Sequence, residues 1–377
     1  RVRAGEPLVF RFEGTSAIER GWIGLWPAHA FPEAVPSTQW RYLHGTQEQR
    51  SERGPARGAL RFPTGADPEA PLPPGDYVAW LLANDRDEPL APPLRCTVTP
   101  RTEPQLEPAR DRVRVLVWNL WHGGKEDGEA GLARAIEILR AADPDVALLI
   151  ETYGSGQRIA AALDRHLLMA TPADNLAILS RWPIREVWDL GDRFHAIGGV
   201  IEVPGFGPLA CVDVWLSYAA EIWEEGTRAR HSIAEMLAQH ERSALADLEA
   251  LLLPLERRVA GRTALPLVLG GDFNSMSHED YVESARSQYG EPIAWPVTRR
   301  LVELGYRDAW RAVHPQVDRA ADRTWSPRFP AQEQDRIDFV FSRGEALLPR
   351  RAERIDRHAE RFPSDHAALW VEFVKPR

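Results

Sequence analysis

The chain has 377 residues, of which 44% are hydrophobic and 27% are charged, and its formal net charge is −9. Its length exceeds that of one typical domain, and its composition is that of a folded globular protein. The acidic charge argues against broad binding along a nucleic-acid backbone, which needs a basic surface. No apolar run is long enough to cross a bilayer, so membrane attachment could only be peripheral.

Residues 1–100 are predicted to form an all-β domain. Short runs rich in aliphatic and aromatic residues alternate there with Pro/Gly turns, and the spacing favours a small immunoglobulin-like β-sandwich. The predicted strands are Val9–Phe12, Trp22–Trp26, Gly58–Phe62, Tyr77–Leu82 and Leu94–Val98. Five aromatic residues of this region are expected to pack in its core, namely Trp22, Trp26, Trp40, Tyr42 and Trp80. A ligand-facing or membrane-facing patch is the alternative.

A change of pattern separates this region from the rest of the chain. The stretch from Thr99 to Arg110 contains three prolines and no apolar periodicity, which predicts an extended linker at residues 101–111. From residue 112 to residue 377, strands alternate with helices, which indicates a domain of mixed α/β (α+β) type. The clearest strands are Val113–Val117 and Val146–Glu151, and helices are predicted near 129–142, 156–167 and 220–258. Cys96 and Cys211 lie in apolar runs and are expected to be free thiols.

Polar residues stand at the ends of several short apolar runs in the second domain. The set comprises Asn119, Glu151, Asp272, Asn274, Asp338, Asp365 and His366, and every member except His366 offers a side-chain oxygen atom. Taken singly, each is as readily a turn former or helix cap. As a set at strand ends they can converge on one edge of stacked sheets, where a hard cation and a phosphate could bind. The set therefore predicts a metal-dependent phosphoester hydrolase.

These segments, in this order and ending in Ser364-Asp365-His366, resemble the endonuclease/exonuclease/phosphatase superfamily. Two further elements carry the resemblance, Ala177–Ile184 and Thr324-Trp325 ahead of Arg336-Ile337-Asp338. It implies that residues 112–377 are the catalytic domain, a four-layer sandwich of two central β-sheets flanked by helices. Residues 1–100 look similar to the SKICH-type sandwich found beside some phosphoinositide phosphatases.

The resemblance also implies roles for the polar residues. Glu151 would be the principal ligand of a divalent cation, helped by Asn119 and Asp365. Asp272 would orient or deprotonate the attacking water, with Asn274 contacting the phosphoryl oxygen.

His366 would hydrogen-bond the phosphate or protonate its developing charge, with Asp338 fixing the imidazole. A carboxylate on one ring nitrogen favours the imidazolium form. The cofactor is expected to be Mg²⁺ or Mn²⁺, as one or two ions, with Ca²⁺ as an alternative. Zinc is not expected, because no Cys/His cluster is present.

Three more residues are predicted to contact the substrate. His122 and Lys125 lie in a glycine loop just after Asn119, and His278 closely follows Asn274. A glycine loop with a lysine could hold a substrate phosphate. The alternative for each residue is an ordinary solvated or structural side chain.

One position departs from the superfamily pattern. Members usually end the strand before the long helix with His or Tyr, whereas Trp215 stands at that place in this sequence. An indole donates one hydrogen bond but cannot transfer a proton near neutral pH. A bound water, Tyr218 or His122 would then protonate the leaving group. Trp215 is predicted to line the substrate cleft. The alternative is that Trp215 points into the sheet core.

The predicted substrate is a small organic or lipid-derived phosphate ester. A nuclease and a catalytically silent binding protein are the alternatives, and nucleic acid is disfavoured by the acidic charge. Inositol polyphosphate phosphatases fit less well, because Gln334 stands where their Cys precedes Asp-Arg-Ile. A monomer is expected. The chain begins with Arg1 rather than Met, which weakly favours a processed, secreted or periplasmic protein.

Overall fold

The computed structural model describes residues 1–14, 18–32, 34–48, 55–66, 71–85, 87–101, 111–171, 173–218, 222–262 and 264–376. The chain forms two compact units. The first comprises the described parts of Arg1–Leu106 and Gly156–Ala173, and the second those of Glu107–Ser155 and Asp174–Arg377. Apart from Arg101 and Asp111, the predicted linker lies outside the described residues, and the domain division at residues 101–111 stays a prediction.

Two β-sheets face each other in the first unit. The larger has the order β1-β8-β6-β3-β4, with β7 beside β6, and the smaller pairs β2 with β5. Their strands are β1 (Val2–Arg3), β2 (Leu8–Glu13), β3 (Trp22–Pro27), β4 (Gln39–Tyr42), β5 (Arg57–Phe62), β6 (Gly75–Ala83), β7 (Glu88–Pro89) and β8 (Leu94–Thr99). Side chains from both sheets, among them Phe10, Leu25, Phe62 and Val98, form one buried core. Each of the predicted strands coincides with an observed strand, and β1, β4 and β7 were not predicted.

The aromatic residues expected in this core lie on the opposite face of the larger sheet. Successive side chains of a strand point to opposite faces. On β3 the core takes Ile23 and Leu25, so Trp22 and Trp26 point the other way. The same alternation places Trp40, Tyr42 and Trp80 on that face through their pairing with β3. These aromatic residues therefore pack outside the core between the two sheets. Burial is confirmed for Trp26 and Tyr42, whereas Trp22, Trp40 and Trp80 are half-buried.

Two further sheets form the framework around the predicted catalytic residues. Within the described residues each has six strands, in the orders β11-β12-β10-β9-β20-β19 and β13-β14-β15-β16-β18-β17. Their strands are β9 (Arg112–Asn119), β10 (Val146–Ile150), β11 (His166–Leu168), β12 (Ala177–Ser180), β13 (Ile184–Trp188), β14 (Ala196–Val203), β15 (Gly207–Trp215), β16 (Leu267–Asp272), β17 (Arg307–Asp308), β18 (Asp338–Arg343), β19 (Leu348–Ile355) and β20 (Ala368–Val374).

These two sheets pack face to face and touch closely at Gly270. A Cβ atom at Gly270 would lie 2.7 Å from Val117 Cγ2 and 3.1 Å from Leu148 Cδ1, which are shorter than ordinary carbon contacts. Gly270 of β16 thus lets the backbone of the second sheet approach β9 and β10 of the first. By the alternation of side chains, Asn119 shares the inner face with Val117, and Asp272 shares it with Gly270.

Helices connect the strands and cover the outer faces of the two sheets. They are η1 (His122–Gly124), α1 (Gly128–Ala142), α2 (Gly156–Leu163), η2 (Arg228–Arg230), α3 (Ile233–Arg242), α4 (Ala244–Val259), η3 (Glu283–Ala285), α5 (Arg286–Tyr289), α6 (Pro296–Glu303), α7 (Ala309–Val313) and α8 (Arg319–Asp322). None of the described helices has the length and apolar character needed to cross a membrane.

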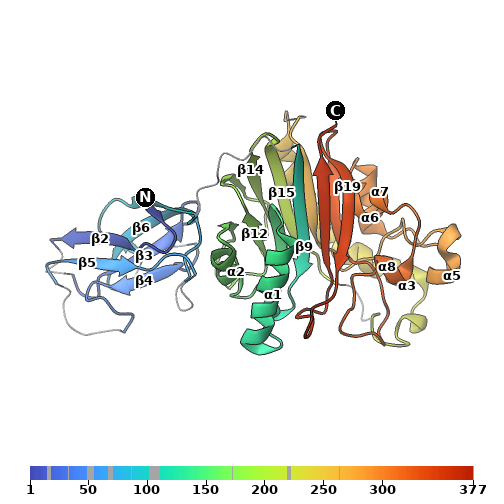
Figure 1. The fold of residues 1–377 in the computed structure, drawn as a ribbon, viewed down its shortest axis with the longest axis horizontal. Helices are drawn as coiled ribbons and strands as arrows, with labels where there is room; N and C mark the ends of the chain where they lie inside the picture. The colour runs from blue at the N-terminus through green and yellow to red at the C-terminus, as the bar shows by residue number, and fades with distance from the viewer. Residues whose placement is uncertain are drawn as a thin grey trace. The chain divides into compact units, whose positions relative to one another are not determined.

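Packing of the helices completes the layers. Leu248 and Leu252 of α4 meet Val212 and Phe341 of the second sheet in one buried cluster that α6 also enters. On the other side α1 lies beside the first sheet (Figure 1), and Trp370 Nε1 donates a hydrogen bond of 3.2 Å to the carbonyl of Ala142 at its end. The predicted fold class, two central sheets flanked by helices, is confirmed.

Two helix boundaries differ from the prediction. The helix expected at 156–167 ends at Leu163, because Asp164 takes a left-handed conformation (φ 55°) and the chain turns into β11. The helical region expected at 220–258 is divided at Ser243, whose φ of −112° and ψ of −98° are not helical. The cysteines are free as predicted, with Cys211 buried and Cys96 half-buried.

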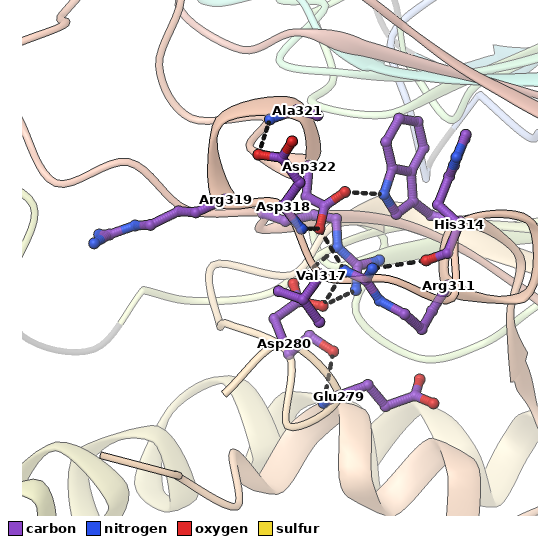
Figure 2. A network of polar contacts seen from close by, with 12 residues as sticks. Glu279, Asp280, Arg311, His314, Val317, Asp318, Arg319, Ala321 and Asp322 are labelled. Carbon is purple, nitrogen blue, oxygen red and sulfur yellow. Dashed lines mark hydrogen bonds and ion pairs between the residues drawn. The ribbon is translucent and has the colours of Figure 1, made fainter. Parts of the chain in front are cut away.

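A buried ionic network lies behind the start of β18. Arg311 Nη2 contacts Asp280 Oδ1 at 2.7 Å and Asp322 Oδ2 at 2.6 Å, and Figure 2 shows its guanidinium between these carboxylates. Arg336 is fully buried and pairs with Asp280 at 2.7 Å and Asp308 at 2.5 Å. Asp280 therefore accepts hydrogen bonds from two arginines, Arg311 and Arg336, at once. Since Arg336 is two residues before Asp338, this network fixes the chain where β18 begins.

We expect Asp280→Asn to lower the free energy of unfolding by about 3–5 kcal/mol, because it removes a shared partner from two buried guanidinium groups. The measurement is urea unfolding followed by circular dichroism. Glu303→Gln is the control, since the Arg299–Glu303 pair on α6 is exposed and should contribute less than about 1 kcal/mol. Equal effects of the two substitutions would contradict a stabilising role for the network.

Candidate active site

The predicted catalytic residues meet at one edge of the two stacked sheets. β9 and β10 are parallel and end there with Asn119 and, one residue beyond β10, Glu151. β16 ends there with Asp272, and its antiparallel neighbour β18 starts there with Asp338. The segment before β20 brings in His366, because β20 runs antiparallel to β9. The sheet directions thus gather side chains that are far apart in the sequence.

Asn119 connects the two sheets at this edge. Its Nδ2 donates to Glu151 Oε1 at 3.1 Å and to Asp272 Oδ2 at 3.0 Å, while its Oδ1 accepts from the backbone N–H of Trp121 at 2.9 Å. The amide nitrogen, rather than the oxygen, therefore faces the carboxylates. In this orientation Asn119 bridges Glu151 and Asp272. The metal ligation by Asn119 that the resemblance implies stays a prediction.

Asp272 is almost fully buried and is held from several sides. Its Oδ1 accepts from the backbone N–H of Asn274 at 2.9 Å, and its Oδ2 accepts from Asn119. Asn274 Nδ2 donates to the carbonyl of Leu216 at 2.8 Å, which fixes the amide beside Asp272. The predicted pair Asp272 and Asn274 is thus brought together, next to Asn119.

Asp338 and His366 form a direct pair. Asp338 Oδ2 lies 2.9 Å from His366 Nδ1, and both residues are buried. His366 Nε2 points towards Asp272 Oδ2 at 3.9 Å. Thr324 positions the carboxylate, because its Oγ1 accepts from the backbone N–H groups of Ile337 and Asp338 at 3.0 and 3.1 Å. The carboxylate–imidazole pair predicted from the sequence is therefore formed.

Several backbone conformations near this edge are unusual. Glu151, Asn274, Trp121 and His122 have φ of 54°, 45°, 51° and 52°, in the left-handed region that L residues other than Gly rarely adopt. Such conformations persist only where the surroundings enforce them, and they concentrate at functional sites. The polar side chains of Glu151 and Asn274 are thus held in place at a conformational cost.

Burial makes the site electrostatically unusual. Burial raises the pKa of Asp272 to about 7, although the imidazole of His366 acts in the opposite direction. Burial likewise raises the pKa of Asp365 to about 6. For His366, burial alone would lower the pKa, but the carboxylates of Asp338 and Asp272 outweigh it and raise this pKa well above its usual value.

The donor set fits a divalent cation. Asp338 Oδ1 and Asp365 Oδ1 are buried and have no hydrogen-bond partner in the described part of the chain. Asp272, Asp338 and His366 offer ligand atoms within 4.8 Å of one another. Among the described residues, His366 is the only side-chain cation that pairs with these carboxylates or with Glu151. Oxygen-rich sites with excess negative charge suit Mg²⁺ or Mn²⁺.

The three predicted flanking residues lie in different surroundings. The backbone N–H of His122 donates to Glu151 Oε2 at 3.1 Å, and its exposed ring pairs with Glu126, which raises the pKa of His122. Lys125 Nζ donates to the carbonyl of Tyr153 at 3.3 Å. His278 Nδ1 instead lies 2.9 Å from Thr298 Oγ1 of α6. Of the three, only His122 directly contacts a member of the polar set, through its backbone.

Trp215 stands beside the polar set. It is the register partner of Asp272, which in turn is the partner of Asp338, so all three side chains point to the same face of the second sheet. The ring of Trp215 stacks on His195 with centroids 5.6 Å apart and meets Phe194 edge to face at 5.3 Å. Trp215 is half-buried rather than enclosed in the core. This placement is consistent with the predicted contact with substrate, which remains untested.

Some positioning residues were not predicted. Asn175 Oδ1 accepts from the backbone N–H of Glu151 at 2.9 Å, and its Nδ2 donates to the carbonyl of Phe194 at 2.9 Å. Ser364 Oγ donates to the carbonyl of Asn119 at 2.6 Å. Asn175 lies two residues before Ala177–Ile184, an element that carries the resemblance, and that position could have identified it.

Comparisons with known proteins point to one family. The sequence model of the Endonuclease/Exonuclease/phosphatase family matches residues 116–366. The uncharacterized protein F14F9.5 of Caenorhabditis elegans is 25% identical over 305 residues, covering 70% of this chain and 91% of that protein.

Solved structures that are similar to the chain include an endonuclease/exonuclease/phosphatase protein from Beutenbergia cavernae DSM 12333. It is 20% identical, with a TM-score of 0.48 over 71% of this chain and 72% of its own. Truncated TDP2 of Caenorhabditis elegans is 18% identical, with a TM-score of 0.46. The match covers 70% of this chain and 98% of the TDP2 chain. The 3'-5' exonuclease NExo from Neisseria meningitidis is 20% identical, with a TM-score of 0.46. The match covers 69% of this chain and 99% of the exonuclease chain.

Proposed function

Because the chain belongs to the endonuclease/exonuclease/phosphatase family, it is a metal-dependent phosphoric ester hydrolase, and we propose that it acts on a small organic or lipid-derived phosphate ester. The observation that carries this proposal is the row of Trp215, Asp272 and Asp338 across the second sheet. It places a half-buried indole on the face that carries the polar set, where it offers apolar surface to a substrate.

Glu151 and Asp365 would hold the cation, which we propose to be Mg²⁺ or Mn²⁺. Both carboxylates lie at the strand-end edge, and the unpartnered Oδ1 of Asp365 is available as a ligand atom. When bound, the cation neutralises phosphate charge and stabilises the leaving oxygen. Asn119 would keep Glu151 apart from Asp272 through its two hydrogen bonds.

Asp272 would orient the attacking water and accept its proton. Its carboxylate is fixed by Asn119 and Asn274, so little rearrangement is needed when the water binds. His366, held by Asp338, presents Nε2 on the side of Asp272 and would donate a hydrogen bond to a phosphoryl oxygen. Asp338 also favours the charged imidazolium needed for that donation.

The surroundings of Trp215 support a compact, partly apolar substrate. Phe194 and Tyr218 flank Trp215 and are 44% and 57% exposed, so the aromatic group continues to the surface. The net charge of −9 disfavours a nucleic-acid backbone as the main ligand.

Removal of the metal should abolish turnover. We expect hydrolysis of bis-p-nitrophenyl phosphate to stop on exhaustive dialysis against EDTA and to return with Mg²⁺ or Mn²⁺, because all the proposed ligands are oxygen donors. The measurement is release of nitrophenol, with Ca²⁺ and Zn²⁺ as comparison ions. Turnover that persists after dialysis would refute the mechanism, and a protein inactive with every ion would favour a silent binding protein.

Loss of the proposed base or of the imidazole should lower kcat. We expect Asp272→Asn and His366→Ala each to reduce kcat by at least ~10²-fold, the usual scale for a lost general base or acid. His358→Ala is a matched control, because His358 pairs with Glu137 and contacts no member of the polar set. Near-normal kcat in either folded variant, judged by circular dichroism, would mean that the site is misassigned.

The substrate proposal is tested at Trp215. We expect Trp215→Ala to raise KM for p-nitrophenyl phosphocholine by at least roughly tenfold, since a buried apolar contact of this size is worth about 1.5–3 kcal/mol. KM for fully polar phosphate esters should change less. Wild-type cleavage of plasmid DNA that outpaces small diesters would instead support a nuclease.

A further inference from the structure

The outer face of the larger sheet in the first unit carries an aromatic pocket. Its volume is about 480 Å³, and its lining includes Trp22, Trp26, Trp40, Tyr42, Asp85 and Asp87. Pockets of roughly 300–1,000 Å³ are of the size that holds a small organic ligand. The sandwich core lies on the other face of the same sheet, so these aromatic side chains are not needed to join its two sheets.

The aromatic rings form walls that meet nearly at right angles. Trp40 is perpendicular to Tyr42 (90°, centroids 5.2 Å apart) and nearly perpendicular to Trp22 (79°, 6.1 Å). A ligand between such walls meets ring faces from more than one direction. A flat sugar ring, in contrast, stacks on one open aromatic plane. This arrangement therefore suits a compact, rounded group.

Gly24 makes this arrangement possible. A Cβ atom there would lie 2.4 Å from Trp26 Cζ3 and 2.8 Å from Trp22 Cζ3. The two indoles therefore occupy the space above Gly24, and Trp40 of β4 is paired directly across from it. Trp26 is anchored by a hydrogen bond of 2.8 Å from Nε1 to the carbonyl of Val35. The pocket floor is thus built by packing and not by chance exposure of single side chains.

Two carboxylates line the pocket. Asp85 Oδ1 accepts from the hydroxyl of Tyr42 at 2.7 Å, which fixes that ring, and Asp85 also pairs with Arg20. Asp87 is exposed and forms no ion pair with any described residue. The described lining contains no basic side chain. Aromatic faces are themselves negative, and Arg20 balances the charge of Asp85, so the rings and Asp87 favour the same kind of ligand, a cation.

We propose that this pocket binds a quaternary ammonium group of the choline type. Perpendicular aromatic walls with a carboxylate are the arrangement that recognises such cations, because the methyl groups contact ring faces while the charge stays without hydrogen bonds. The volume of about 480 Å³ leaves room for a substituent on the ammonium group. The proposal concerns the first unit and is independent of the substrate proposed for the polar site.

In the test, the full chain is titrated with choline, and binding is measured by tryptophan fluorescence and by calorimetry. Dimethylbutanol, the neutral carbon isostere of choline, is the matched ligand control. We expect saturable choline binding and at least about tenfold weaker binding of the isostere, since the cation–aromatic attraction is absent from it. A parallel sedimentation assay compares phosphatidylcholine with phosphatidylglycerol vesicles. It distinguishes free choline compounds from a lipid headgroup as the source of the ligand.

Variants connect the binding to the pocket. Trp40→Leu should weaken choline binding roughly tenfold, and Asp87→Asn, an exposed and structurally mild change, should weaken it several-fold. Glu13→Gln removes the same charge from the smaller sheet and should leave binding unchanged. Turnover of a chromogenic ester should be normal in all three variants. The proposal is overturned if neither choline nor phosphatidylcholine vesicles bind, if the isostere binds as well as choline, or if Asp87→Asn and Glu13→Gln behave alike.

Discussion

The close face-to-face packing of two sheets is the constraint on which the polar site depends. Gly270 has no side chain to separate β16 from Val117 and Leu148 of the first sheet. Two residues further along each strand, the same spacing brings Asn119 Nδ2 within 3.0 Å of Asp272 Oδ2. A larger residue at Gly270 would push the sheets apart, and the single amide that bridges them could no longer reach both carboxylates.

That packing also buries carboxylates, and their negative charge is balanced differently at two places. In the ionic network, Asp280 accepts from both Arg311 and Arg336, so its buried charge is balanced by guanidinium groups. At the polar site, within the described residues, Asp272 and Asp365 have no arginine or lysine partner, although the chain has 46 Lys and Arg residues. Arginine at the polar site would neutralise the carboxylates permanently. Its absence there leaves negative charge that a divalent cation can balance.

Much of the site was predictable because its residues follow buried strands. Asn119, Glu151, Asp272 and Asp338 each adjoin an apolar run, and sheet directions alone bring such ends to one edge. The orientation of the Asn119 amide was not predictable, because it depends on the backbone N–H of Trp121, whose left-handed conformation no sequence pattern specifies.

The N-terminal region shows a different limit of sequence patterns. The predicted strand Trp22–Trp26 contains only apolar residues and Gly24, so its sequence does not say which face is covered by the second sheet. Ile23 and Leu25 face that sheet, whereas Trp22 and Trp26 lie on the opposite face. Likewise, the break between α3 and α4 at Ser243 interrupts a continuous helical periodicity, because a single non-helical residue leaves the apolar spacing almost unchanged.

The indole of Trp215 restricts how the leaving group can be protonated. Trp215 is the register partner of Asp272, and its indole cannot transfer a proton near neutral pH. Tyr218 is 57% exposed and contacts Trp215 edge to face at 6.4 Å, which places its hydroxyl-bearing ring beyond the indole, at the surface. His122 is better placed, since its backbone N–H binds Glu151 and its ring pairs with Glu126, which raises the pKa of His122. On the first sheet, His366 is a second acid, because Asp338 favours its imidazolium form. We therefore propose that leaving-group protonation falls to His122 or His366 rather than to a residue at position 215.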